Sequence, residues 1–267
     1  MTTSGHEISE AAGFLSRAKR VAVITGAGIS AESGLRTFRG AVNADLPADM
    51  RALWKEFDPA TLATPEAFGR DPAMVSKWYD WRRLGCLAAE PNAGHASLTG
   101  LQERMEAGGG EVVVLTQNVD RLHQRAGTRG VVELHGTIME WRCTRTGTRM
   151  TPPDVAFEHY PVASPYAEGG LLRPDVVWFG ECLPEAAVRA AARAAATCDV
   201  FLSVGTSAVV YPAAGFLLEA KEHGAYTIEV NPESTPASGV VDASLRGTAS
   251  AVLPRLLAAA FEKGATL

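Results

Sequence analysis

The chain has 267 residues, of which 46% are hydrophobic, and a formal net charge of -5 at pH 7. This size allows one large hydrophobic core, or a main domain with a smaller satellite. The acidic balance argues against a nucleic-acid-binding surface, which concentrates positive charge, although basic proteins can still be substrates. No stretch resembles a signal peptide or a bilayer-spanning helix, so we expect a cytoplasmic protein without a membrane partner.

Residues 7–19 have hydrophobic positions at helical spacing and predict a helix, which is followed by an apolar strand at 21–25. The strand runs into a glycine-rich turn, in which Gly26 permits a tight bend and Gly28 lets a phosphate approach the backbone. Free N–H groups at the start of the next helix would then face a pyrophosphate. The G-x-G-x-x-A pattern also occurs at purely structural strand-to-helix corners, so the rest of the chain must decide.

The remaining elements predict a parallel sheet with helices on both faces, because buried strands alternate with helices. In chain order we expect a loop with helical pieces to about residue 71, helices at 72–84 and 94–107, a strand at 112–115, a short helix at 121–126, strands at 131–134 and 176–179, a helix at 185–197, a strand at 200–204, a helix at 212–223 and a strand at 226–230. Residues 138–172 interrupt this alternation with prolines and glycines, which predicts an inserted module of irregular or short β elements.

Small or polar residues follow the expected strands of the main sheet. They lie at 25–28, 116–118, 135–136, 205–207 and 231–233. Because parallel strands end at the same edge of a sheet, these residues would line a single crevice. Backbone N–H groups, hydroxyls and a carboxylate there could hold phosphates and ribose hydroxyls.

These residues resemble the sirtuins, the NAD-dependent protein-lysine deacylases, over nearly the whole chain. The matching motifs occur in the family's order: GAGISAESG at 26–34, FRG at 38–40, TQNVDRLH at 116–123, AG at 126–127, LHG at 134–136, LRPDVVWFGE at 172–181, GTS at 205–207 and VN at 230–231. The resemblance implies a Rossmann-like domain with a smaller inserted domain, made from a helical segment and a zinc-ribbon-like module that lacks its metal ligands. We assign residues 1–35, 86–137 and 173–267 to the first domain, and residues 36–85 and 138–172 to the second.

The resemblance also implies that NAD is consumed as a co-substrate. The acyl-lysine amide oxygen attacks the ribose carbon as nicotinamide leaves, and a base then deprotonates a ribose hydroxyl. His135 looks like that base, since a neutral imidazole is available near neutral pH. Asn118 resembles the residue that positions the nicotinamide ribose, and Asp120 matches the position near the carboxamide. Alternatively, His135 is structural and Asp120 is a helix-terminus charge; we expect His123 to be structural.

Further cofactor contacts follow from the same resemblance. Phe38 would shield the reacting carbon from water, Arg39 would lie by the phosphates, and Ser207, Asn231 and Glu233 would contact the adenosine half. The full set is Gly26, Ala27, Gly28, Ser30, Phe38, Arg39, Gln117, Asn118, Asp120, Gly205, Thr206, Ser207, Asn231 and Glu233.

Tyr79 and Arg82 resemble the Tyr-x-x-Arg signature of the sirtuins that remove succinyl, malonyl and glutaryl groups. An arginine can pair with the terminal carboxylate of such a chain, a tyrosine hydroxyl can hydrogen-bond to it, and helical spacing brings both to one point. Ala67 matches a small residue that enlarges the acyl pocket. The alternative is that Tyr79 belongs to the core and Arg82 to a solvated helix face.

The stretch at residues 177–181 resembles the edge to which the acyl-lysine peptide adds as an extra strand. Its members are Val177, Trp178, Phe179, Gly180 and Glu181. On the alternative interpretation, Val177 and Phe179 are core residues of a strand, and Trp178 is a surface aromatic.

The cysteines depart from the family pattern. Most sirtuins carry two C-x-x-C pairs after the histidine motif, but here Cys143 stands alone, with Thr146, Ser164 and Ala167 near the other three positions. A structural zinc needs four sulfur or imidazole ligands, and one thiol with a distant His159 does not supply them. We therefore expect no bound metal and a module held by packing and hydrogen bonds. The four cysteines of the chain contain no C-x-x-C pair and predict no disulfide framework.

Together, the motifs predict an NAD-dependent protein-lysine deacylase that removes succinyl or malonyl groups from proteins or peptides. The products would be nicotinamide, O-acyl-ADP-ribose and free lysine. The alternatives are a general protein-lysine deacetylase, an ADP-ribosyltransferase and a non-catalytic NAD-sensing protein. His135 favours deacylation, because that reaction requires activation of the ribose hydroxyl.

Overall fold

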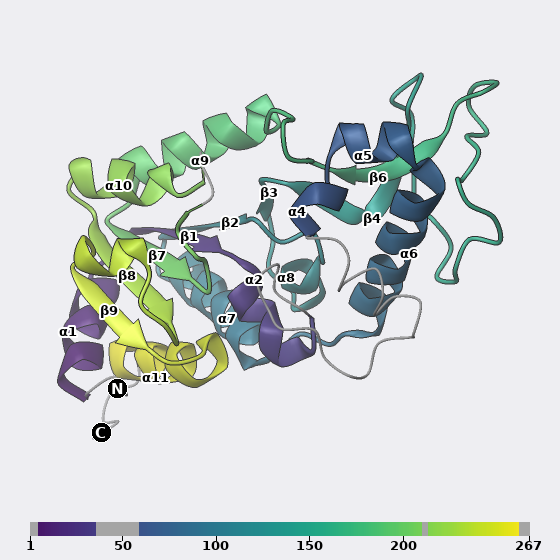
Figure 1. Cartoon of the computed structure of the whole chain (residues 1–267). Coiled ribbons are helices and arrows are strands. Elements are labelled where there is room, and N and C mark those ends of the chain that lie inside the picture. Colours follow the sequence, from purple (N-terminus) through teal and green to yellow (C-terminus); the bar gives the residue numbers. More distant parts are fainter. Residues whose placement is uncertain (1–4, 36–58, 210–212, 262–267) are drawn as a thin grey trace.

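A computed structural model describes residues 5–35, 59–209 and 213–261. Its strands form one six-stranded sheet and a separate three-stranded sheet, which lie side by side (Figure 1). The predicted α/β fold, with a parallel sheet and a smaller part beside it, is confirmed. Across the described ranges, every helix is too short or too polar to cross a lipid bilayer.

The large sheet has the strand order β3-β2-β1-β7-β8-β9, and all neighbouring strands are parallel. Within this sheet the chain starts at the central strand β1 and adds β2 and β3 on one side of it. It later returns to the other side of β1 with β7. This reversal is a topological switch point, where open α/β sheets bind ligands beyond the carboxyl ends of their strands. The strands are β1 (Arg20–Thr25), β2 (Glu111–Thr116), β3 (Val132–Glu133), β7 (Val200–Val204), β8 (Tyr226–Asn231) and β9 (Ala243–Arg246).

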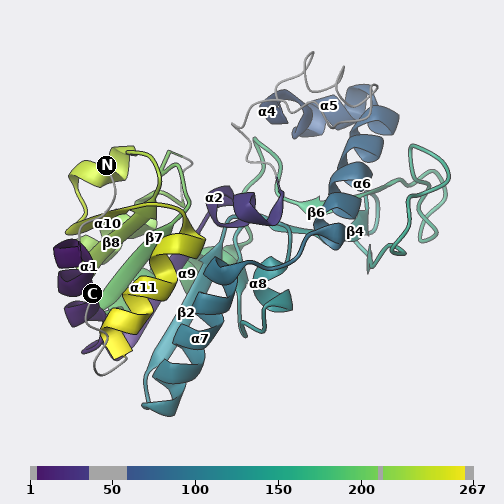
Figure 2. The same ribbon diagram turned by 90° about the horizontal axis from the view of Figure 1, so that it is seen from below.

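Helices cover both faces of this sheet (Figures 1 and 2). Side chains alternate along β1, so that Val21 and Val23 pack under α1, α7 and α11, whereas Ala22 and Ile24 pack under α9 and α10. The bounds are α1 (Gly5–Leu15), α7 (Ala93–Ala107), α9 (Glu185–Thr197), α10 (Gly215–Glu222) and α11 (Ala249–Phe261). The sheet therefore has a hydrophobic core on each side, and its loops carry the polar residues.

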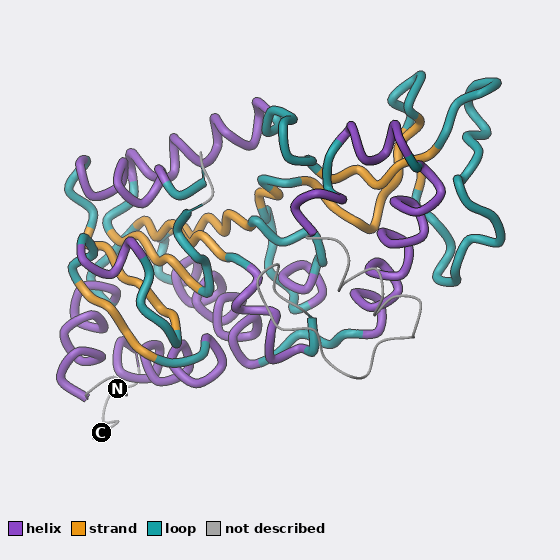
Figure 3. The backbone as a smooth tube through the Cα atoms, viewed as in Figure 1, coloured by secondary structure: helices purple, strands orange, loops and turns teal. Residues whose placement is uncertain are grey.

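In the described residues, the smaller part combines an antiparallel sheet, with the order β5-β4-β6, and the helices α4, α5 and α6. Its core includes Trp78, Trp141 and Trp178. Long loops connect its short strands (Figure 3). The elements are α4 (Pro59–Leu62), α5 (Pro65–Arg70), α6 (Pro72–Ala88), β4 (Gly136–Cys143), β5 (Arg149–Met150) and β6 (Leu172–Val176).

Helix α6 begins where its sequence specifies a start. The carboxylate of Asp71 accepts a hydrogen bond from the Met74 amide at 2.9 Å, and Pro72 occupies the first turn. Such a cap satisfies an amide that has no partner within the helix, and proline at this position loses no hydrogen bond. The seventeen-residue helix that follows carries Tyr79 and Arg82.

The strand predicted at residues 176–179 was wrong. The strand β6 ends at Val176 and pairs with β4 in the antiparallel sheet, not in the parallel one. Beyond it, the Val177 amide donates to the His135 carbonyl at 2.9 Å, and the Phe179 amide donates to the Ala63 carbonyl at 2.8 Å. The hydrophobic run therefore bridges between separate segments, which strand periodicity does not reveal. The strand β9 and the helix α11 were not predicted.

Candidate active site

The glycine turn after β1 interlocks with the turn after β7. A Cβ atom added to Gly28 would lie 2.7 Å from both the Cα and the carbonyl oxygen of Gly205, and Gly205 itself has a positive φ of 60°. The amides of Gly26 and Gly28 donate to the carbonyls of Val204 and Gly205, at 3.1 and 2.8 Å. The expectation that free N–H groups at the start of the next helix face a pyrophosphate is thus wrong for Gly28, because its amide is bonded to the other turn.

A buried polar network lies directly below the glycine turn. The side-chain amide of Asn118 donates to the Gly26 carbonyl and to the Ser30 hydroxyl, both at 3.1 Å. Ser30, at the end of α2 (Ala27–Ser30), donates in turn to the Asp120 carboxylate at 2.7 Å. Asp120 also accepts the Leu122 amide at 2.9 Å, at the start of α8 (Leu122–Arg125). Asp120 therefore accepts the first amide of α8 and also orients Ser30.

His95 belongs to this network, and sequence reasoning missed it. Its Nδ1 accepts the Asn92 amide at 3.3 Å, so its Nε2, 3.4 Å from the Ser30 hydroxyl, carries the proton. The signal was the pair formed by Asn92 and His95, which occupy the first and last positions of a capping box at the start of α7. Burial lowers the pKa of His95, so this imidazole is neutral.

His123 holds the first strand to the short helix α8, as the sequence predicts. Its Nε2 lies 2.9 Å from the Thr25 hydroxyl, which donates onward to the Thr116 hydroxyl at 2.9 Å. Burial, followed by the neighbouring His95, lowers the pKa of His123 to about 3. A permanently neutral histidine in this position is a structural hydrogen-bond donor rather than a proton acceptor.

His135 follows the short strand β3 and remains partly exposed. Its Nδ1 lies 3.0 Å from the carbonyl oxygen of Gln117, which can only accept, so Nδ1 carries the proton. The lone pair of the imidazole is therefore on Nε2. Burial lowers the pKa of His135, although the hydrogen bond to Gln117 acts in the opposite direction. The residue is thus neutral and oriented, as a general base must be.

The loops after β2, β7 and β8 are joined by side chains. Gln117 donates to the Thr206 hydroxyl at 3.2 Å, and Asn231 donates to the Thr206 carbonyl at 2.8 Å. The Glu233 amide donates back to the Asn231 side chain at 3.3 Å. Ser207 is half-buried beside them, and the Glu233 side chain is exposed. The structure therefore brings these predicted residues to one edge of the sheet.

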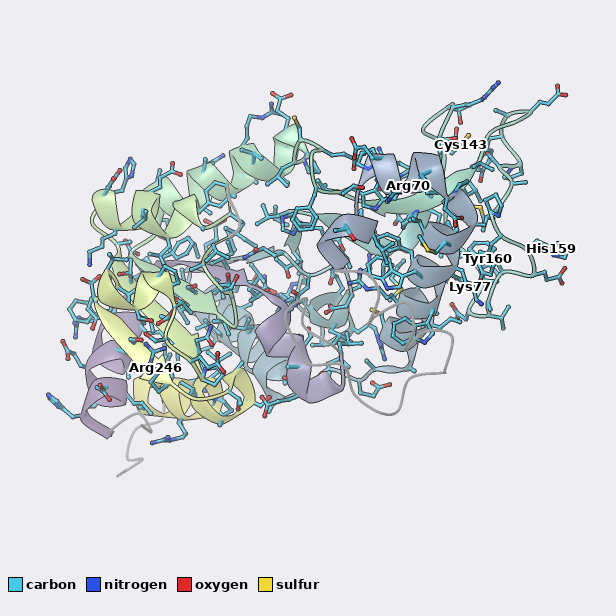
Figure 4. All side chains as sticks on the ribbon, viewed as in Figure 1. Arg70, Lys77, Cys143, His159, Tyr160 and Arg246 are labelled. Carbon is cyan, nitrogen blue, oxygen red and sulfur yellow. The ribbon has the colours of Figure 1, made fainter. Side chains whose placement is uncertain are left out.

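Glu229 anchors this edge from beneath, and it was not predicted from the sequence. Its carboxylate is buried on β8 and accepts hydrogen bonds from the hydroxyls of three residues. It also forms an ion pair with Arg246, which is labelled in Figure 4. The three hydroxyl donors are Thr235, Ser238, at 2.6 Å, and Ser244, at 2.8 Å. Thr235 precedes the turn η2 (Pro236–Gly239), Ser238 lies in it, and Ser244 lies on β9. Glu229 therefore holds that turn against β9.

Tyr79 and Arg82 meet on one side of α6, as predicted. The guanidinium of Arg82 lies 5.5 Å from the Tyr79 ring and 4.7 Å from the Trp78 ring. Ala67 and Trp178 are buried in the same hydrophobic cluster as Tyr79. Burial raises the pKa of Tyr79 to about 12, so its phenol stays protonated and can donate a hydrogen bond.

The segment at residues 177–181 divides its side chains between two directions. Trp178 is 2% exposed and Phe179 is 48% exposed. The alternative interpretation, with Phe179 in the core and Trp178 at the surface, is therefore wrong for both residues. Gly180 is exposed and Val177 is half-buried. The Glu181 carboxylate is turned inward, where it pairs with Arg173 at 2.6 Å and accepts the Trp178 amide at 2.9 Å. Phe38 and Arg39 lie outside the described residues.

A family model described as "Sir2 family" matches residues 26–212. The chain belongs to the Sir2 family. The NAD-dependent protein deacylase 2 of Pyrobaculum aerophilum is 48% identical over 92% of this chain and 93% of its own length. A Sir2 homologue solved with NAD has a TM-score of 0.84 and 40% identity, covering 96% of this chain and 94% of its own. A mutant Sir2 homologue solved with 2'-O-acetyl ADP ribose also has a TM-score of 0.84, with 40% identity over 94% and 95% of the two chains.

Membership of the Sir2 family confirms the resemblance drawn from the motifs, and it makes the missing cysteines notable. Cys143, Ser164 and Ala167 do converge, because a Cβ added to Gly170 would lie 3.2 Å from the Cys143 sulfur, 3.3 Å from the Ser164 Cβ and 3.0 Å from the Ala167 carbonyl oxygen. The four positions carry the thiol of Cys143, the hydroxyls of Thr146 and Ser164, and the methyl group of Ala167. These groups do not supply the four sulfur or imidazole ligands that a structural zinc ion needs. His159 lies in the same loop as Ser164 and Ala167 but apart from Cys143 (Figure 4).

Other side chains do not make up for these missing ligands. Over residues 5–35, 59–209 and 213–261, His, Cys, Asp and Glu form no group of three or more that could hold a metal ion. Hydrogen bonds from Ser164 and Thr146 lower the pKa of the Cys143 thiol to about 7. In this Sir2 protein the converging positions therefore form a small hydrogen-bonded cluster.

Proposed function

We propose that this protein is an NAD-dependent protein-lysine deacylase that removes succinyl or malonyl groups more readily than acetyl groups. The names of its relatives and the NAD and 2'-O-acetyl ADP ribose found in Sir2 homologues support NAD as the co-substrate. The observation that carries the acyl preference is the contact between Arg82 and Tyr79 beside the buried Ala67.

The residues around the switch point would hold NAD. The glycine turn at Gly26 and Gly28, packed against Gly205, would form the floor of the site, and the edge formed by Thr206 and Asn231 would receive the adenosine half. When bound, NAD supplies the ribose carbon that the acyl-lysine amide oxygen attacks as nicotinamide leaves. Asn118 is fixed by Gly26 and Ser30, and would orient the nicotinamide ribose. His135 would accept a ribose hydroxyl proton at Nε2.

The acyl preference follows from the charge of the acyl chain. Succinyl and malonyl chains end in a carboxylate, which loses its hydration when it enters a largely apolar pocket. Arg82 supplies a positive charge and Tyr79 a neutral phenol donor for that carboxylate. Ala67 leaves space where a larger side chain would fill the pocket. An acetyl group makes neither polar contact, so it would leave the charge and the donor unused.

The peptide would bind beside Phe179 and Gly180, where the exposed backbone follows β6. An extended substrate there would add as a strand between the large sheet and the small module. Phe179 presents an exposed ring for hydrophobic contact with it, and the inward-facing Glu181 keeps the segment in place through Arg173.

The test compares one peptide sequence bearing succinyl-lysine, malonyl-lysine or acetyl-lysine. We expect kcat/KM to be highest for the two acidic acyl groups, with O-acyl-ADP-ribose detected by mass spectrometry. A clear preference for acetyl-lysine would favour a general deacetylase. Transfer of ADP-ribose to protein without release of free lysine would favour an ADP-ribosyltransferase, and NAD binding without turnover would favour an NAD-sensing protein.

We also propose that the small domain formed by residues 36–85 and 138–172 functions without zinc. The cluster of Cys143, Thr146 and Ser164 supports this, because two of its three side chains are hydroxyls rather than thiols. The Arg145 amide already donates to the Cys143 sulfur at 3.4 Å, and the Thr146 hydroxyl donates to Thr148 at 2.9 Å. Backbone pairs close the same region, such as the Ser164 amide with the Gly170 carbonyl at 2.9 Å.

A further inference from the structure

Helix α6 presents two functional faces to two different surroundings. Tyr79 and Arg82 face the cluster that contains Trp178. Asp80 and Arg83 each follow these residues by one position, which displaces them by about 100° around the helix. They bond instead to the long loop between β5 and β6, whose Tyr160 is labelled in Figure 4. A rotation of α6 would therefore change both faces together.

Asp80 and Arg83 form a fully buried ion pair, at 0% and 1% exposure. The Asp80 carboxylate lies 2.6 Å from Nη2 of Arg83 and also accepts its Nε at 2.8 Å. Buried ion pairs require further partners, because both charges have lost their water. The loop at residues 153–160 provides these partners.

The loop supplies four hydrogen bonds to this pair. Arg83 donates to the carbonyls of Pro153 and Val155, at 2.7 and 2.8 Å. Asp80 accepts the Phe157 amide at 2.9 Å and the Tyr160 hydroxyl at 2.5 Å. Burial and the contact with Asp80 raise the pKa of Tyr160, which keeps its hydroxyl a donor. Two side chains of one helix thus organise a loop of irregular backbone.

We propose that Asp80 and Arg83, tied to the loop at residues 153–160, are positioning residues that set the rotation of α6 and so the geometry of Tyr79 and Arg82 toward the acyl chain. This inference rests on the proposed function of Tyr79 and Arg82. It also gives the pair a role in ordering the small module, because the pair fixes backbone at residues 153–160 that has no regular secondary structure. Neither residue touches the substrate in this proposal.

The test uses Tyr160→Phe, which deletes one hydroxyl, and Asp80→Asn, which removes the charge that faces Arg83. Glu158→Gln is the matched control, because Glu158 is an exposed residue of the same loop. For each full-length variant, KM and kcat are measured for succinyl-peptide, acetyl-peptide and NAD, together with Tm. We expect Tyr160→Phe to raise KM for succinyl-peptide about fivefold, as for one lost hydrogen bond, and to leave KM for NAD unchanged.

A purely structural role would lower Tm or the amount of active enzyme without a selective change in KM for acyl-peptide, and that result would overturn the proposal. Tyr160→Phe keeps the proposal testable if Asp80→Asn does not fold.

Arg82→Met is measured in parallel to separate the positioning role from the proposed acyl preference. If Arg82→Met changes acyl selectivity and Tyr160→Phe does not, the positioning role is wrong and the proposed function stands. If wild type prefers acetyl-lysine, the proposed acyl preference is wrong, and the positioning role that rests on it falls with it.

Discussion

The Nδ1 atom of His135 lies 3.0 Å from the carbonyl oxygen of Gln117. Because a carbonyl oxygen can only accept a hydrogen bond, Nδ1 carries the proton of the neutral imidazole, and Nε2 is left as the basic atom. Gln117 itself is tied to the turn after β7 through Thr206. Gln117 therefore contacts both His135, the proposed base, and Thr206, a proposed cofactor contact.

Replacing His135 with alanine should abolish deacylation while the first chemical step persists. In the proposed mechanism the base acts only after nicotinamide has left, so loss of Nε2 should lower kcat for lysine release by about 10²- to 10⁴-fold. Exchange of labelled nicotinamide into NAD in the presence of acyl-peptide should continue. Equal loss of both activities would mean that His135 positions the substrates rather than accepting a proton.

The pH dependence of kcat/KM should reflect the lowered pKa of His135. Burial disfavours the imidazolium, so the neutral base persists as the pH falls below the ordinary histidine pKa of about 6.5. We expect kcat/KM for succinyl-peptide to remain level through pH 6.5 and to decline only in more acidic solution. A decline centred above pH 6.5 would contradict the assignment of His135 as the base.

Arg82→Met should remove the acidic-acyl activity selectively. Loss of one charge-assisted hydrogen bond corresponds to about 10- to 100-fold in kcat/KM for succinyl-peptide. Activity on acetyl-peptide should change little, because an acetyl group has no carboxylate. Lys77→Met, on an exposed position of the same helix, is the control. Equal losses on both peptides would show that Arg82 is structural.

Glu229→Gln should weaken NAD binding through the turn that Glu229 holds. An amide replaces one acceptor oxygen with a donor, so the surrounding hydroxyls lose a partner at a cost of about 1–3 kcal/mol in unfolding free energy. We expect KM for NAD to rise while KM for acyl-peptide stays constant. Glu222→Gln, on the exposed end of α10, controls for the loss of charge. A rise in both KM values would indicate general loosening of the fold.

Metal removal should have no effect on stability or activity. Because the cluster around Cys143 lacks the ligands for zinc, Tm measured before and after dialysis against a strong chelator should be the same. Cys143→Ser should likewise retain activity, since serine can keep a hydrogen bond to the neighbouring hydroxyls. Stoichiometric zinc that survives dialysis, detected by elemental analysis, would overturn the zinc-free proposal.

Local patterns in the sequence determined much of the main domain. Hydrophobic periodicity predicted β1, β2, β7, β8 and most of the helices between them, because side-chain spacing depends only on near neighbours. The polar strand ends could be assigned to one edge for the same reason, since parallel strands share a direction. The short spacing of Tyr79 and Arg82 was likewise sufficient to predict that they meet on one side of a helix.

Tertiary structure decided the contacts that join distant segments. The sequence contained no pattern linking His95 to Ser30, Glu229 to the η2 turn, or Asp80 to Tyr160, because each pair meets only through packing of separate elements. The same cause explains residues 176–179, whose hydrophobic run predicts a strand. The strand β6 instead ends at Val176 and pairs with β4, and the residues beyond it bond to His135 and Ala63 of other segments. The sequence by itself therefore determined the chemistry of the residues at the switch point, and folding determined which buried groups orient them.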